Sequence, residues 1–109
     1  MIGRMALHPK NAKIVSTMLG FEDHGIMTCY LYLDYDGSGQ GFGGYALGGE
    51  FGIEFIKKIL KTLEVDKWED LAGTHCRAEA GHDKVHRIGH ILKDQWFDPK
   101  DIVPEHEKK

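Results

Sequence analysis

The densest run of chemically suggestive residues is a glycine cluster, in which residues 39–44 read Gly-Gln-Gly-Phe-Gly-Gly. Its Gly-x-Gly-x-x-Gly spacing matches the fingerprint of dinucleotide-binding loops, whose glycines let the backbone approach a pyrophosphate. That chemistry requires a helix to begin at the last glycine, so that its first amide groups meet the phosphate. Here Tyr45-Ala-Leu-Gly-Gly separates the cluster from the predicted helix, and no Gly-Lys-Ser/Thr follows. The cluster therefore favours a turn that leads into a glycine-rich strand, and no cofactor is predicted.

The overlapping segment Asp34-x-Asp36-x-Ser38-Gly39 has the oxygen-ligand spacing of the first half of a calcium-binding loop. The second half is missing, because Tyr45 stands where a bidentate glutamate is needed. Asp36-Gly37 is also a strong signal for a hairpin turn, since such turns require positive φ. We therefore predict a hairpin turn with Asx hydrogen bonds, and a weak cation site stays the alternative.

Histidines form the next group, and His86 and His90 are an even number of positions apart, which places both on one face of a strand. A zinc ion would need a third ligand from a neighbouring strand, such as His75 or Cys76. Structural zinc sites usually have more closely spaced ligand pairs. The pattern favours hydrogen-bonded packing histidines, with His75, His86 and His90 as the weaker metal-binding alternative.

Little in the sequence supports catalysis. Asp23 and His24 are adjacent, which does not make a catalytic dyad, and no serine or cysteine has a recognisable nucleophile context. No catalytic residue is predicted.

Aromatic residues provide the remaining candidate site. Apolar and more polar residues alternate along the predicted strand 26–35. We therefore assign its apolar set to the face that the helix covers: Met27, Cys29, Leu31 and Leu33. The opposite face carries tyrosines that are partly exposed or buried in an oligomer contact, and tyrosine-bearing faces bind proteins or stack on bases. The predicted partner-binding residues lie on this face, in the glycine-rich hairpin and in a neighbouring loop: Asp23, His24, Tyr30, Tyr32, Gln40, Phe42 and Tyr45. Alanine at Phe42 and Tyr45 is expected to abolish binding and leave folding largely intact.

Periodicity predicts the elements that position these residues. Five strands are expected at residues 14–19, 26–35, 40–47, 74–80 and 84–92, with an edge contact at 96–97. An apolar stripe of 3.6-residue period predicts a helix from Glu50 to Leu63, and Asp66-x-x-Glu69 resembles a capping box. The order β-β-β-α-β-β indicates a small α+β fold, with a mostly antiparallel sheet and one amphipathic helix packed on one face. Residues 1–109 are expected to form a single domain, in which residues 1–12 and 103–109 are loosely ordered.

Composition narrows the class of protein. The 109 residues carry a net charge of −3, so there is no basic field to hold nucleic acid. No apolar run is long enough to span a membrane, and no secretory signal is recognised. The two cysteines, Cys29 and Cys76, are far apart and lie in apolar runs, which indicates free thiols in a reducing cytoplasm.

Several strings resemble a family of small bacteriophage and prophage proteins without an assigned activity. They are Thr17-Met-Leu-Gly20, Glu22-Asp-His-Gly25, Gly39-Gln-Gly-Phe-Gly-Gly-Tyr45, Trp68-Glu-Asp-Leu71, Ile88-Gly-His-Ile91 and Trp96-Phe97. The resemblance runs from about residue 13 to residue 98 and implies action in the cytoplasm of a bacterial host. By analogy, the leading hypothesis is a non-enzymatic binding protein that inhibits a host or antiviral-defence macromolecule. The alternatives are a homo-oligomer that sequesters a nucleotide signal, a metal-stabilised domain and, last, a small metal-dependent hydrolase.

Overall fold

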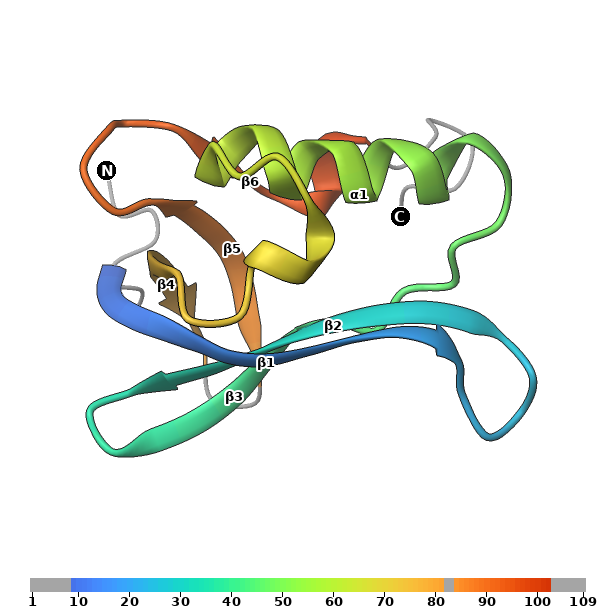
Figure 1. Cartoon of the computed structure of the whole chain (residues 1–109), viewed down its shortest axis with the longest axis horizontal. Helices are drawn as coiled ribbons and strands as arrows, with labels where there is room; N and C mark the ends of the chain where they lie inside the picture. The colour runs from blue at the N-terminus through green and yellow to red at the C-terminus, as the bar shows by residue number, and fades with distance from the viewer. Residues whose placement is uncertain (1–8, 82–83, 103–109) are drawn as a thin grey trace.

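The computed structural model describes residues 9–81 and 84–102 and contains one helix that packs against a six-stranded sheet (Figure 1). Every strand pairs antiparallel with its neighbours, in the order β3-β2-β1-β4-β5-β6. The predicted α+β class and element order are therefore confirmed. The elements are β1 (Pro9–Phe21), β2 (Met27–Tyr35), β3 (Ser38–Gly43), α1 (Gly49–Leu63), β4 (His75–Ala80), β5 (Val85–His90) and β6 (Trp96–Phe97), with short 3₁₀ turns η1 (Trp68–Asp70) and η2 (Pro99–Asp101).

Strand β1 is longer than the sequence pattern predicted, and it joins the two halves of the sheet. Its residues 9–13 pair with β4, while residues 13–21 pair with β2, with a register shift between Ile14 and Ser16. The expectation that residues 9–12 are loosely ordered is wrong, because β4 supplies them with a partner and Ala12 is buried. Residues 1–8 and 103–109, for which the same was expected, lie outside the described residues.

The hairpin of β2 and β3 has the predicted turn. Asp36 and Gly37 both have positive φ, at 53° and 76°, as a two-residue primed turn requires. Strand β3 is shorter than expected, because Gly43 and Gly44 have φ of 123° and 88° and redirect the chain. The backbone N–H of Gly44 still donates to the carbonyl of Cys29 at 2.8 Å.

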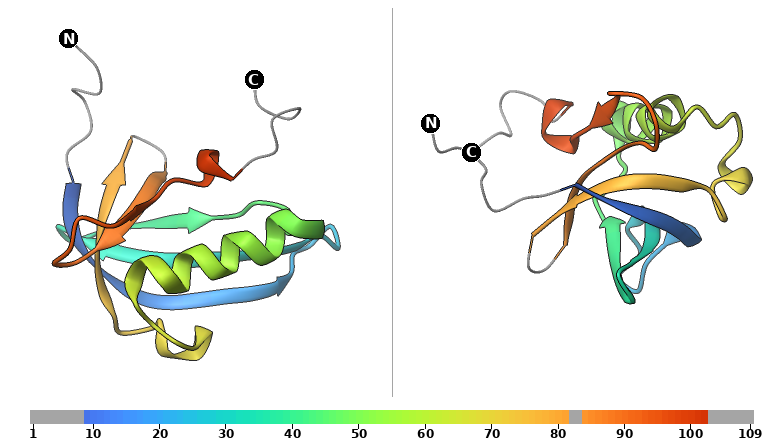
Figure 2. Two further views of the ribbon diagram at one scale, coloured as in Figure 1. Left: turned by 90° about the horizontal axis from the view of Figure 1, so that it is seen from above. Right: turned by 90° about the vertical axis from the view of Figure 1, so that its left-hand side faces the viewer.

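Helix α1 lies against one face of the sheet (Figures 1 and 2) and buries its apolar stripe there. Phe55, Ile59 and Leu63 of the helix join Cys29, Leu31 and Leu33 of β2 in a single core. This confirms which face of β2 the helix covers.

The predicted capping box at residues 66–69 is wrong. The turn η1 begins after Lys67, and no side chain caps its amide groups. The segment is instead attached to the sheet by Trp68, whose Nε1 donates to Oγ1 of Thr17 at 3.1 Å. Within the described residues, no helix combines the length and apolar character needed to cross a membrane.

Candidate partner-binding surface

The face of the sheet opposite the core carries a tyrosine pair. Because side chains alternate along a strand, the burial of Leu31 and Leu33 puts Tyr30 and Tyr32 on the outer side of β2. Their rings stack with centroids 5.6 Å apart and an interplanar angle of 17°. Tyr30 is half-buried, and Tyr32 keeps 41% of its surface exposed. Both tyrosines are thus partly exposed in the described chain, and their burial in an oligomer contact stays an alternative prediction.

A shallow groove of about 510 Å³ lies beside Tyr32. It is lined by Val15, which is 50% exposed, by Tyr32 and Asp34, and by residues 37–41 of the hairpin, which we call its floor. Gly41 is the β3 residue opposite Tyr32, and Gly39 is opposite Asp34. We call Val15, Tyr30, Tyr32, Gly39 and Gly41 together the tyrosine face.

The groove is open where its floor carries no side chain, at Gly37, Gly39 and Gly41. A Cβ atom at Gly39 would approach only the carbonyl oxygen of Leu33, at 3.7 Å, and one at Gly41 would approach only the Tyr30 ring, also at 3.7 Å. Both distances are ordinary van der Waals contacts, so larger residues would fit at these positions and would fill the groove. The two glycines therefore expose backbone and aromatic surface that a side chain would cover.

Gly43 and Gly44 serve a different purpose, which is close packing. A Cβ atom on Gly43 would lie 2.3 Å from the carbonyl oxygen of Cys29, and one on Gly44 would lie 3.0 Å from the Tyr30 ring. Both residues also have φ values that favour glycine. The glycine cluster thus divides into a groove floor and a tight packing contact, and α1 begins only at Gly49.

The expectation that Phe42 and Tyr45 share the tyrosine face is wrong. Phe42 lies opposite Leu31, and residues opposite each other on paired strands share a face, so its side chain enters the core and is only 1% exposed. Tyr45 follows the two redirecting glycines and packs against α1, with its ring centroid 5.5 Å from that of Phe55. Burial raises the pKa of the Tyr45 phenol. Both residues stabilise the fold, so their alanine variants cannot report on binding alone.

The other predicted binding residues are not gathered at the groove. Gln40 contributes backbone to the groove floor, but its side-chain Oε1 accepts a hydrogen bond from the Tyr35 hydroxyl. Asp23 and His24 are exposed in the turn between β1 and β2, which lies at the far end of these strands from the β2–β3 turn (Figure 1). The backbone N–H of His24 donates to the Glu22 carboxylate. The structure therefore separates the Asp23–His24 turn from the tyrosine face.

The histidines do not converge on a metal-binding position. In the described part of the chain, no three His, Cys, Asp or Glu side chains are placed to hold a metal ion. His75 is exposed at the start of β4, opposite Lys13. At the start of β5, Val85 is buried and His86 is half-buried, next to a register shift in the pairing with β4 between Glu79 and Ala80.

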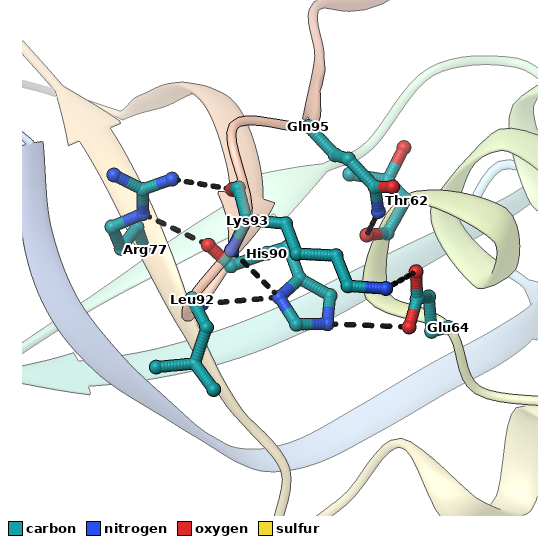
Figure 3. Close-up of polar contacts among 7 residues, drawn as sticks. All are labelled: Thr62, Glu64, Arg77, His90, Leu92, Lys93 and Gln95. Carbon is teal, nitrogen blue, oxygen red and sulfur yellow. Dashed lines mark hydrogen bonds and ion pairs between the residues drawn. The ribbon is translucent and has the colours of Figure 1, made fainter.

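His90 belongs to a polar network that joins the turn after β5 to the end of α1 (Figure 3). Its Nδ1 accepts from the backbone N–H groups of Leu92 and Lys93, at 3.0 and 3.1 Å, and its Nε2 lies 3.6 Å from the Glu64 carboxylate. A hydrogen bond from Lys93 lowers the pKa of that carboxyl group. The same turn is held by Arg77, whose Nε and Nη2 donate to the carbonyls of His90 and Lys93 at 2.8 and 2.7 Å. Both ring nitrogens of His90 are engaged in structural contacts.

Sequence reasoning missed Val15 as a member of the tyrosine face. The signal was present, because Ile14 and Val15 are consecutive apolar residues and neighbouring residues of a strand point to opposite faces. Ile14 is fully buried, so Val15 falls on the outer side.

Compared with models of protein families, with curated proteins and with solved structures, the chain matches none. The resemblance to small bacteriophage proteins therefore stays a prediction.

Proposed function

We propose that this chain is a non-enzymatic binding protein that engages a macromolecular partner through its tyrosine face. The observation that carries the proposal is the exposure of Tyr32 and Val15 at the rim of a glycine-floored groove. Tyrosine supplies a large contact area at a low entropic cost and is enriched among the residues that dominate binding energy. An open groove with an aromatic wall suits the surface of another macromolecule.

The polar groups of the groove support binding rather than bond cleavage. The polar residues that line the groove are Tyr32, Asp34, Ser38 and Gln40, and the nearby Asp36 carboxylate is paired with Lys10, whose Nζ lies at 2.8 Å. These groups can orient a partner through hydrogen bonds and one charge. The resemblance to bacteriophage proteins extends the proposal to a host or antiviral-defence macromolecule, whose activity the bound chain blocks.

Affinity capture from bacterial host extract tests the proposal, with immobilised wild-type protein, Tyr32→Ala and a control variant. Ile53→Ala is a suitable control, because Ile53 is an exposed apolar residue on α1 and takes no part in the tyrosine face. We expect a species that the wild type and Ile53→Ala retain equally and that Tyr32→Ala retains about thirtyfold less, as the loss of a dominant contact worth about 2 kcal/mol implies. Equal retention by all three proteins would contradict a role for the tyrosine face.

A further inference from the structure

The second half of β1 is a free sheet edge. On the side away from β2, residues 9–13 of β1 pair with β4, and Ile14 exchanges hydrogen bonds with Gly73 and Thr74 at 2.7 and 2.9 Å. Beyond that point, no strand in the described part of the chain pairs with residues 16–21 on this side. Figure 1 shows this half of β1 extending past β4 and β5, with β2 as its neighbour among the described strands, while the turn η1 contacts Thr17 through Trp68.

The register determines which backbone groups this edge presents. The N–H of Glu22 donates to the carbonyl of Ile26 at 2.9 Å, and antiparallel pairs alternate between bonded and non-bonded positions. Counting back from that bond, Gly20, Met18 and Ser16 bond to β2, opposite Thr28, Tyr30 and Tyr32 respectively. The N–H and C=O groups of the intervening residues, Thr17, Leu19 and Phe21, therefore point outward along the edge.

Two sequence features that commonly prevent strand pairing, charge and proline, are absent from this edge, while the register shift before Ser16 and the contact of Trp68 with Thr17 affect its first residues. Residues 16–21 read Ser-Thr-Met-Leu-Gly-Phe and contain no charged residue and no proline, which are common protections of sheet edges. Leu19 and Phe21 are 41% and 72% exposed, and Met27, opposite Phe21, is exposed on the same face. An apolar edge of this length is a strong template for another strand.

We propose that a second copy of this chain pairs with residues 17–21 of β1, antiparallel and about a two-fold axis. The segment is self-complementary: with the axis at Leu19, the two Leu19 residues face each other, and each Thr17 faces Phe21 of the other copy. No like charges meet, because the segment carries none. The pairing joins the exposed Leu19 and Phe21 side chains of both copies into one apolar layer. The assembly also stops at two copies, because each copy uses its free β1 edge once and neither β1 edge remains to bind a third copy.

An interface of about five residues per strand is small, so the dimer is expected to be weak and to depend on concentration. Sedimentation velocity of the untagged protein from ~10 to ~500 µM should show the mass rising from monomer to dimer without larger species. Amide hydrogen exchange should slow at least about tenfold at Thr17, Leu19 and Phe21 over that range. The amides of Met18 and Gly20, which already bond to β2, should change little.

Leu19→Pro is the matched disruption. Proline has no backbone N–H, and the N–H that it removes at residue 19 points outward, away from β2. Proline is tolerated on edge strands at positions where the N–H faces away from the sheet. Leu19→Ala shortens the same side chain and keeps the N–H. We expect Leu19→Pro to raise the dimer dissociation constant at least tenfold relative to Leu19→Ala. A monomer at the highest concentration, open-ended assembly, a dimer whose protected amides lie elsewhere, or a folded Leu19→Pro variant that dimerises normally would each overturn the proposal. These measurements use no partner macromolecule, so their outcome is independent of the proposed function.

Discussion

The ring of Phe42 in β3 meets the ring of Phe97 in β6 edge-on, with centroids 6.0 Å apart. These strands are the two ends of the sheet order, so the sheet bends until its first and last strands share one core. Phe55 of α1 completes the cluster, with its ring centroid 5.8 Å from Phe42 and 5.4 Å from Phe97. Phe42 therefore stabilises the fold from within the core, and the outer side of the β2–β3 hairpin is left available for binding.

Alanine variants of Phe42 and of Tyr32 should differ clearly in their free energy of unfolding, because one residue is in the core and the other is on the tyrosine face. Phe42→Ala removes a buried ring from the junction of three elements and should lower the free energy of unfolding by about 3–5 kcal/mol. Tyr32→Ala alters an exposed residue and should cost less than about 1 kcal/mol. Urea unfolding followed by circular dichroism measures both. Similar losses for the two variants would contradict the assignment of the two faces of the hairpin.

Gly43 should tolerate no side chain. Gly43→Ala places a methyl group 2.3 Å from the carbonyl oxygen of Cys29 at a φ of 123°, so we expect a loss of about 1–3 kcal/mol. Gly41→Ala is the matched control, because its methyl group meets the Tyr30 ring at 3.7 Å without strain. Thermal unfolding of the pair provides the comparison, and equal melting temperatures would refute the packing role of Gly43.

The two buried thiols should make the protein less stable in alkali. Burial raises the pKa of Cys29 and of Cys76 from 9.0 to about 12. Between these values the unfolded chain loses thiol protons that the folded protein keeps, so the free energy of unfolding falls as the pH rises from about 9 towards 12. Each thiol contributes a slope of up to about 1.4 kcal/mol per pH unit.

Removing one thiol isolates this effect from other groups that titrate in alkali. Cys76→Ala should show a shallower decline of unfolding free energy above pH 9 than the wild type. Both thiols should also react with a disulfide reagent at pH 8 only after unfolding, because almost none of either is ionised in the folded state. Parallel pH profiles for the variant and the wild type would contradict this account.

His90 should be a structural residue. His90→Ala removes the acceptor for two backbone N–H groups and should lower the free energy of unfolding by about 1–3 kcal/mol. His75→Ala, at an exposed position, should change it by less than about 0.5 kcal/mol. Faster hydrogen exchange at the amides of Leu92 and Lys93 in His90→Ala would locate the loss at the turn. An unchanged exchange pattern there would show that the ring does not hold it.

Features with local causes were predictable from the sequence. The Asp36-Gly37 turn follows from the need for positive φ at two successive residues, and α1 follows from a long stripe of 3.6-residue period. The two faces of β2 follow from the alternation of residues 29–34, whereas Met27 is exposed and Thr28 is buried at its start. Each of these signals lies within one short segment of the chain.

Features that depend on pairing between distant segments were not predictable. Phe42 was misplaced because glycines on both sides leave no alternation to read, and only the register with Leu31 determines its face. Residues 9–12 form a strand because β4, far along the chain, pairs with them. The role of His90 depends on backbone amides of the following turn, which have no signature in residue types.

The most direct test of the tyrosine face is to fill its groove and leave every wall residue unchanged. A Cβ atom at Gly39 would lie 3.7 Å from its nearest neighbour, the carbonyl oxygen of Leu33, which is an ordinary contact, and the β-branched Gly39→Val suits a strand. Affinity capture from bacterial host extract should compare this variant with the wild type, with thermal unfolding as the check on folding. We predict an equal or higher melting temperature together with at least a tenfold loss of the retained partner. A folded Gly39→Val variant that captures the same partner as well as the wild type would contradict the proposal that this groove is the binding site.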